Sequence, residues 1–201
     1  KQLLVENTER LKELKGINRT SEILTKGKSM EESLQVICSV LPEAWQYPEY
    51  TSVRIKYNGR EFVSRNFNES EWWMTQGFVA PGRKKGTIEI FYSKPFPKAD
   101  EGPFLKEERN LLVNLSNLIS GSVTREEFKK LYRANTERLK ELKAINQTSF
   151  IIEEGNPIDE TLQAVCSILP DSFQYPKFTV ARIRFESGIY TSENFRETEW
   201  T

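Results

Sequence analysis

The sequence contains no histidine, so the most common general base and the most common metal ligand of proteins are both missing. Cysteine is almost as scarce. Cys38 and Cys166 each lie within an apolar run, which is typical of a small buried core residue. We therefore expect no metal site, no cofactor and no catalytic residue, and we expect that this chain is not an enzyme.

The sequence also lacks an excess of either charge and any long apolar run. Lys+Arg and Asp+Glu both number 29, so no basic field attracts nucleic acid or an anionic membrane. No segment approaches the roughly 18 apolar residues that span a bilayer, and the N-terminus lacks a signal-peptide core. We expect a cytoplasmic chain with no nucleic acid partner and no membrane contact within these residues.

What the sequence does contain is a long internal repeat. Residues 7–73 recur at 135–201 without insertion or deletion, and 34 of the 67 aligned positions are identical. The offset of 128 residues (135 − 7) is the size of a domain and far exceeds the roughly 20–50 residues of stacked repeats. The repeat predicts a complete unit at 1–133 and a second unit at 134–201, truncated after its second strand.

Local patterns within the first copy predict helices followed by strands. Apolar residues at spacings of three and four predict a helix over 2–25. Ser29 and Glu32 have the spacing of a capping box, which predicts the start of a second helix that ends at Pro42. Alternating apolar residues and the Asn58-Gly59 turn signal then predict antiparallel strands. The expected strands are about 52–57, 60–65, 71–80 and 87–92, with a turn at 81–86.

A long helix over about 104–152 closes the first unit and opens the second. The predicted fold class is α+β, with units of a four-stranded antiparallel sheet packed with helices and joined by this shared helix. A helix of roughly 45 residues is about 65 Å long, more than one unit can bury, which favours a parallel homodimer through the connecting helix. Asn135 and Asn146 interrupt the apolar pattern, so a perfect heptad is not indicated. An antiparallel helix pair within the chain is the alternative.

Two arginines occupy the same repeat position and are candidate ligand-binding residues. Arg54 and Arg182 alternate with core residues, so each side chain faces the opposite side of its strand. An arginine there requires an anionic partner, either Glu71 or Glu199 of the same unit or a ligand carboxylate or phosphate. A solvated arginine or a structural ion pair is the alternative.

The repeated pattern Asn-Phe-x-Glu-x-Glu-Trp supplies the other candidates. Its first and last residues are Asn66 and Trp72 in one copy, and Asn194 and Trp200 in the other. Tryptophans can form a binding cage for a cation or a base, although large aromatics beside strands usually belong to the core. The candidate ligand-binding set is therefore Arg54, Asn66, Trp72, Arg182, Asn194 and Trp200.

Three segments resemble a known family: residues 37–48, the Asn66–Trp72 motif and residues 100–109. Together they resemble a GAF-like sensory module, which occurs, often next to PAS domains, in bacterial and archaeal sensor histidine kinases and related signalling proteins. The resemblance covers nearly the whole chain and implies terminal helices that join a dimeric signalling stalk. The chain has no phosphoacceptor histidine and no Gly-rich ATP lid.

We therefore expect the non-catalytic input region of a signal-transduction protein. It would pass a signal from an unknown small-molecule ligand or partner through the connecting helix to downstream signalling domains. The alternative is a structural spacer or dimerisation scaffold that binds no ligand.

Overall fold

The computed structural model describes residues 2–197, with side chains from residue 10 onward except Arg83. Contacts divide the chain into two compact units that meet between Phe128 and Lys129, inside the long helix. The boundary expected from the repeat lies a few residues further along the same helix. Each unit is described by itself.

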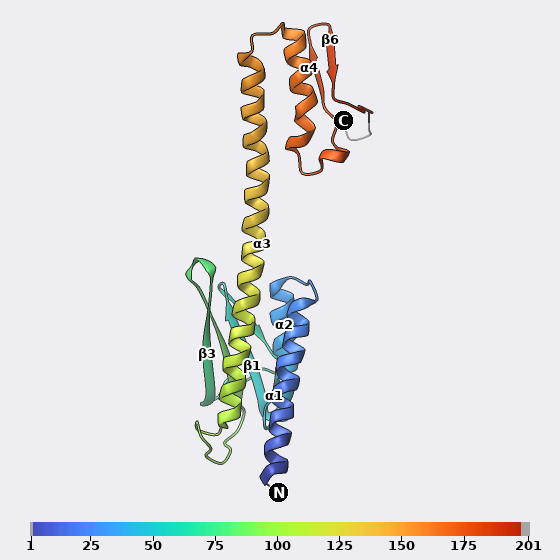
Figure 1. The fold of residues 1–201 in the computed structure, drawn as a ribbon. Helices are drawn as coiled ribbons and strands as arrows, with labels where there is room; N and C mark the ends of the chain where they lie inside the picture. Colours follow the sequence, from blue (N-terminus) through green and yellow to red (C-terminus); the bar gives the residue numbers. More distant parts are fainter. Residues whose placement is uncertain (1, 198–201) are drawn as a thin grey trace. The chain divides into compact units, whose positions relative to one another are not determined.

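The first unit holds most of the secondary structure (Figure 1). Its elements are α1 (Gln2–Thr25), α2 (Met30–Val40), η1 (Leu41–Ala44), η2 (Pro48–Tyr50), β1 (Thr51–Tyr57), β2 (Arg60–Val63), β3 (Trp72–Ala80), η3 (Pro81–Arg83), β4 (Lys84–Tyr92) and the first part of α3 (Lys106–Glu153). The second unit holds the rest of α3, then α4 (Ile158–Ile168), η4 (Leu169–Ser172), η5 (Pro176–Phe178), β5 (Arg182–Phe185) and β6 (Gly188–Thr191).

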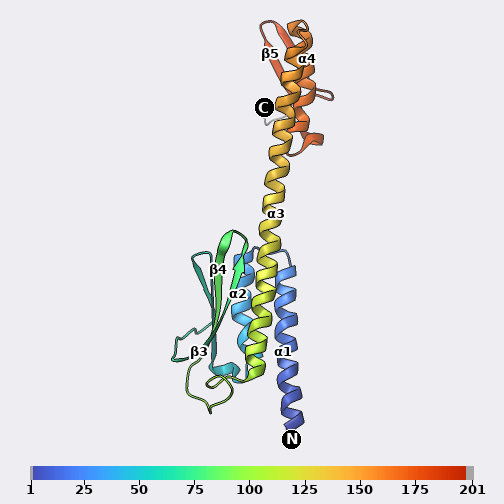
Figure 2. The same cartoon turned by 60° about the vertical axis from the view of Figure 1, so that its left-hand side comes forward.

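The four strands of the first unit form one antiparallel sheet in the order β2-β1-β4-β3. Helices α2 and α3 cover one face of the sheet, and α1 packs on the outside of these two helices (Figure 2). The expected α+β class with a four-stranded antiparallel sheet and a long helix is confirmed.

Local sequence signals explain where several elements begin. The Ser29 side chain accepts a hydrogen bond from the Glu32 backbone, and the Glu32 carboxylate accepts one from the Ser29 backbone, so the predicted capping box is present. Asn58 and Gly59 both have positive φ, at 53° and 76°, as a two-residue hairpin turn requires. Pro157 is the N-cap of α4, and its ψ of 145° is extended.

The core of the first unit lies between the sheet and the helices. Alternate residues of β1 and β4 point to this side, and a stripe of α3 packs onto them. Fully buried members include Val53, Ile55, Ile88, Ile90, Leu112, Leu115 and Ile119. Each such side chain contributes roughly 1.5–3 kcal/mol when it leaves water, so the core is ample for a unit of this size.

Side chains from the helices cap backbone carbonyls at both edges of the sheet. At the β2 edge, Gln35 Nε2 donates to Val63 O at 2.8 Å. The second unit repeats this arrangement, since Gln163 Nε2 donates to Thr191 O at 2.9 Å. Capped carbonyls cannot pair with another strand, which protects an edge from aggregation.

At the β3 edge, side chains of α3 cap two strand carbonyls. Arg109 Nη1 donates to Thr75 O at 2.8 Å, and Ser120 Oγ donates to Val79 O at 2.6 Å. Because these two carbonyls lie four residues apart, they face the same side of the strand. The long helix therefore holds the outer strand through polar contacts as well as through the core.

Both cysteines are free and buried, as the sequence predicted. Burial raises the pKa of the Cys38 thiol from 9.0 to about 12, so the thiol stays protonated and able to donate to Phe62. The Cys166 sulfur lies 3.3 Å from the carbonyl oxygens of Ala181 and Tyr190, and burial also raises its pKa. Both cysteine side chains thus pack against strand carbonyls of their own unit.

The second unit contains one hairpin, β5-β6, packed against α4. Among residues 2–197, no helix is long and apolar enough to cross a membrane.

Candidate functional site

Arg54 lies at the centre of a charged and aromatic cluster on the sheet face that points away from the helices. Its guanidinium pairs with Glu69, and its Nε donates to Glu89 Oε2 at 2.6 Å. The rings of Phe67 and Phe91 each lie 5.3 Å from the Arg54 Cζ. Burial opposes the charge, yet the two carboxylates outweigh it and raise the pKa of Arg54. Two carboxylates and two aromatic rings therefore surround the Arg54 guanidinium, and we call this cluster the clasp.

The anionic partners differ from the one expected. Glu71 was the predicted carboxylate, but Glu69 and Glu89 make the contacts. Glu89 stands directly opposite Arg54 in the β1–β4 register, between the inward-facing Ile88 and Ile90. Strand pairing, which the sequence alone did not specify, brings the second carboxylate to the arginine.

The second unit contains the same clasp in part. Arg182 pairs with Glu197, and the Phe195 ring lies 5.2 Å from its Cζ. The pairing lowers the pKa of the Glu197 carboxyl. Because the cluster recurs with matching residues, we interpret Arg54 and Arg182 as structural ion pairs that hold the Asn-Phe-x-Glu segment onto the sheet.

The tryptophans do not form a common cage. Trp45 is fully buried in the core, and Trp72 is partly buried against that core. Trp73 points to the opposite face of β3, is 51% exposed and stacks on Phe91. Trp72 and Arg54 therefore lie on opposite faces of the sheet. Trp200 lies outside the described residues.

The asparagines of the repeated motif occupy turns. Asn66 and Asn194 have φ values of 60° and 57°, in the left-handed region that asparagine tolerates better than most residues. Asn66 also lines a polar hollow of about 300 Å³ beside Ser52 and Ser64. The backbone requirement is sufficient to explain why both copies carry asparagine here.

A buried carboxylate, Glu108, fixes the start of α3 within the first unit. It is 3% exposed, and its Oε1 accepts from Tyr92 Oη at 2.6 Å and from Gln46 N at 2.8 Å. Its Oε2 accepts from Leu105 N at 2.8 Å. Glu108 thereby joins the end of β4, the η1–η2 connection and the first turn of α3.

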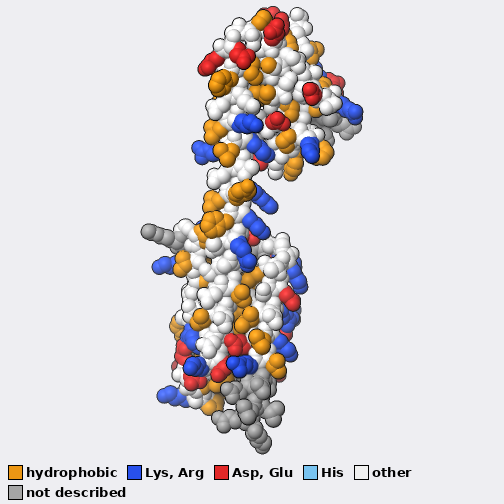
Figure 3. Space-filling model, in the orientation of Figure 1, with side chains coloured by type: hydrophobic (Ala, Val, Ile, Leu, Met, Phe, Trp, Pro, Cys, Tyr) orange, Lys and Arg blue, Asp and Glu red, His pale blue; other side chains and the backbone are white. Residues whose placement is uncertain are grey.

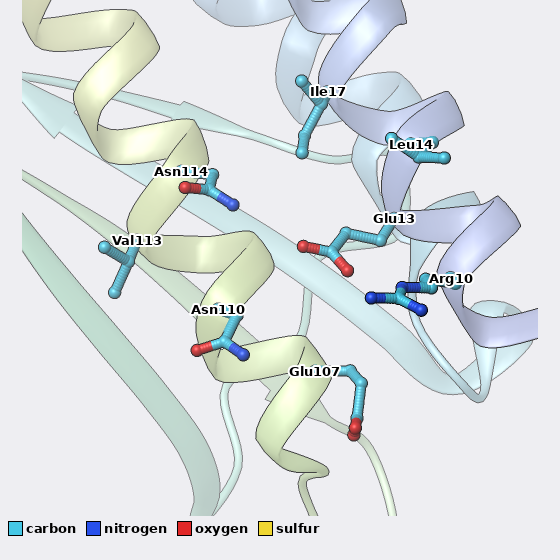
Figure 4. A pocket seen from close by; sticks show the side chains of 8 residues that line it. All are labelled: Arg10, Glu13, Leu14, Ile17, Glu107, Asn110, Val113 and Asn114. Atoms are coloured by element: carbon cyan, nitrogen blue, oxygen red, sulfur yellow. The ribbon is translucent and has the colours of Figure 1, made fainter. Parts of the chain in front are cut away.

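A groove of about 590 Å³ separates α1 from α3 in the first unit (Figure 4). Arg10 and Glu13 reach into it from α1, and Asn110 and Asn114 reach toward them from α3. Leu14, Ile17, Glu107 and Val113 complete its lining. Among the described side chains, these four polar groups have no hydrogen-bond partner, so the groove presents charged and amide groups ready for an occupant.

This groove was absent from the sequence-based candidates, although a signal for it exists. Asn110, Asn114 and Asn117 recur at spacings of four and three, which puts three amides on one side of a helix. The other side of the helix carries the core leucines. Within residues 2–197, no group of three or more metal-ligating side chains occurs.

Comparison of the chain with known protein families and with curated proteins gives no match.

Proposed function

We propose that the chain is the non-catalytic input region of a signal-transduction protein, built from GAF-like units of the kind found in sensor histidine kinases. The observation that carries the proposal is that α3 belongs to both units. Its first part closes the core of the first unit, and the repeat makes its last part the counterpart of α1 in the second unit. A change of packing in either unit therefore acts on an element of its neighbour.

The polar contacts of α3 support a relay. Arg109 and Ser120 tie the helix to the outer strand, Lys84 Nζ lies 3.3 Å from Glu127 Oε1, and Glu108 anchors the first turn. A ligand that shifts the sheet shifts these contacts. The groove and the hollow beside Asn66 are two places within the described residues where a small molecule could act.

The proposed partner is a second copy of the chain, bound through the connecting helix, with downstream signalling domains receiving the output. Large apolar side chains stay on the surface of α3 (Figure 3), among them Phe128, Leu131 and Ile145, each more than half exposed. We also propose a cytoplasmic location, in keeping with two free, buried thiols.

A thermal-shift screen of metabolites on residues 1–201 tests the sensory function. A ligand of the first unit should stabilise it and also change hydrogen exchange in α3 beyond Phe128. The alternative is a spacer that holds other domains apart and binds no ligand. The capped carbonyls at the sheet edges are compatible with this alternative. If no metabolite stabilises either unit and hydrogen exchange in α3 stays unchanged, the spacer is favoured.

A further inference from the structure

The groove between α1 and α3 of the first unit combines charges of both signs with an aliphatic wall (Figure 4). Arg10 brings one positive charge, and Glu13 and Glu107 bring two negative charges. Leu14 and Ile17 follow at the next two turns of α1. The groove therefore has a charged end and an aliphatic end along the helix.

These charges are not neutralised within the first unit. Arg10 and Glu13 lie three residues apart on one helix, a spacing that allows an ion pair, yet none joins them among the described side chains. Glu107 extends from the first turn of α3 and has no partner among those side chains either. Both glutamates are partly buried, so an opposite charge in the groove interacts with them more strongly than it would on an open surface.

Two amides complete the polar lining. Asn110 and Asn114 lie four residues apart and turn their side chains toward α1 (Figure 4). Because an amide donates through its nitrogen and accepts through its oxygen, this pair can bind a carboxylate or an ammonium group. A ligand that carries both groups can hydrogen-bond to α3 while its charges pair with those of the groove.

We propose that the groove binds a free α-amino acid with an aliphatic side chain. Its carboxylate pairs with Arg10, and its ammonium group pairs with Glu13 and Glu107. Its side chain packs against Leu14 and Ile17. The inference rests on the proposed sensory function, for which it names the ligand class.

The charge pattern selects a zwitterion over simpler ligands. An anion would leave both glutamates without a partner, and an amine would leave the arginine without one, whereas a zwitterion satisfies both. The volume of about 590 Å³ lies within the range of small-molecule sites, so an amino acid fits.

Isothermal titration calorimetry with leucine on residues 1–201 tests the site, and we expect a dissociation constant on the order of 0.1 mM. 4-Methylpentanoate is leucine without its amino group, and isopentylamine is leucine without its carboxylate. Each should bind about tenfold more weakly or worse, because one charge of the groove loses its partner. Serine keeps both charges but lacks the aliphatic part, and it should show a similar loss. Absence of binding by leucine, isoleucine and valine up to about 10 mM would overturn the proposal.

Single substitutions show whether the binding occurs in this groove. Arg10→Gln should weaken leucine binding about tenfold but should not weaken isopentylamine binding, since this amine has no carboxylate. Glu13→Gln should weaken the binding of both. Arg138→Gln is the matched control, because the repeat gives Arg138 the position of Arg10 and Arg138 does not line the groove. Equal losses in Arg10→Gln and Arg138→Gln, or unchanged leucine binding in Arg10→Gln, would also overturn the proposal.

The ligand class and the sensory function fail separately. If leucine binds in the groove without changing hydrogen exchange in α3 beyond Phe128, the site stands and the relay is refuted. If another metabolite stabilises the first unit and changes that exchange while no amino acid binds, the sensory function stands and the ligand class is refuted.

Discussion

Replacing Glu108 by glutamine should destabilise the first unit strongly. The amide keeps one acceptor oxygen for Tyr92 and Gln46, but it turns an NH₂ group toward Leu105 N, which is itself a donor. Hydrogen bonds to a charged group contribute roughly 1.5–3 kcal/mol each, and an unsatisfied buried donor adds a similar penalty. We expect a loss of about 2–4 kcal/mol in the free energy of unfolding.

Urea unfolding followed by tryptophan fluorescence measures this loss, because Trp45, Trp72 and Trp73 all belong to the first unit. With an m-value of about 2 kcal/mol/M, the midpoint should fall by roughly 1–2 M. Glu107→Gln is the matched control, since it removes the same charge from the same helical turn without a buried partner. Equal midpoints for the two variants would refute the assigned role of Glu108.

Three further outcomes follow from the described contacts. Gly16→Ala should destabilise the first unit, because a Cβ there would lie 2.8 Å from Ala44 Cβ and overpacking by about 1–3 kcal/mol outweighs the helix gain of about 1 kcal/mol; a raised unfolding midpoint would contradict this. Cys38 should react with thiol reagents at pH 8 only on unfolding. Its raised pKa means that its contribution to stability is complete below pH 9.0 and is lost as the pH rises toward 12; fast labelling of the native protein would count against this burial. The Arg109 hydrogen bond lowers the pKa of Glu101, so its contribution is present above pH 4.5 and is lost on acidification. In Arg109→Gln, an NMR titration should show that pKa return toward 4.5, and an unchanged value would exclude the pairing.

The sequence predicted elements well where the signal is local. The bounds of α1, the capping box at Ser29 and the Asn58-Gly59 turn all depend on neighbours within a few residues, and each is confirmed. The repeat also identified α3 as a shared element. Because helical spacing and turn chemistry are local properties, no tertiary information was required for these predictions.

The candidate site was harder to predict because it depends on contacts between distant segments. Glu89 reaches Arg54 through the strand register, and Glu108 is buried by Tyr92 and Gln46 from other elements. Alternation within a strand also does not show that Trp72 and Arg54 face opposite sides of the sheet. It defines the two faces of one strand, but only the strand register relates them to the faces of the neighbouring strand.

Identity between the two units reflects the fold more than recognition. The arginines at 54 and 182 are held in equivalent clasps, and the asparagines at 66 and 194 occupy left-handed turns. Both cysteines lie against strand carbonyl groups. Each of these three retained features thus has a structural cause, so we seek ligand specificity where the units differ.

The hollow beside Asn66 is such a place. Its rim carries Glu49 and Arg65 in the first unit, and the repeat puts Lys177 and Glu193 at these positions, with both charges reversed. Exchanging the two charges in the first unit, by Glu49→Lys with Arg65→Glu, changes exposed side chains and should alter stability by no more than about 0.5 kcal/mol. A charged metabolite that acts through this hollow should lose its thermal shift in that variant. If the shift persists, the ligand binds elsewhere, and the α1–α3 groove becomes the next region to mutate.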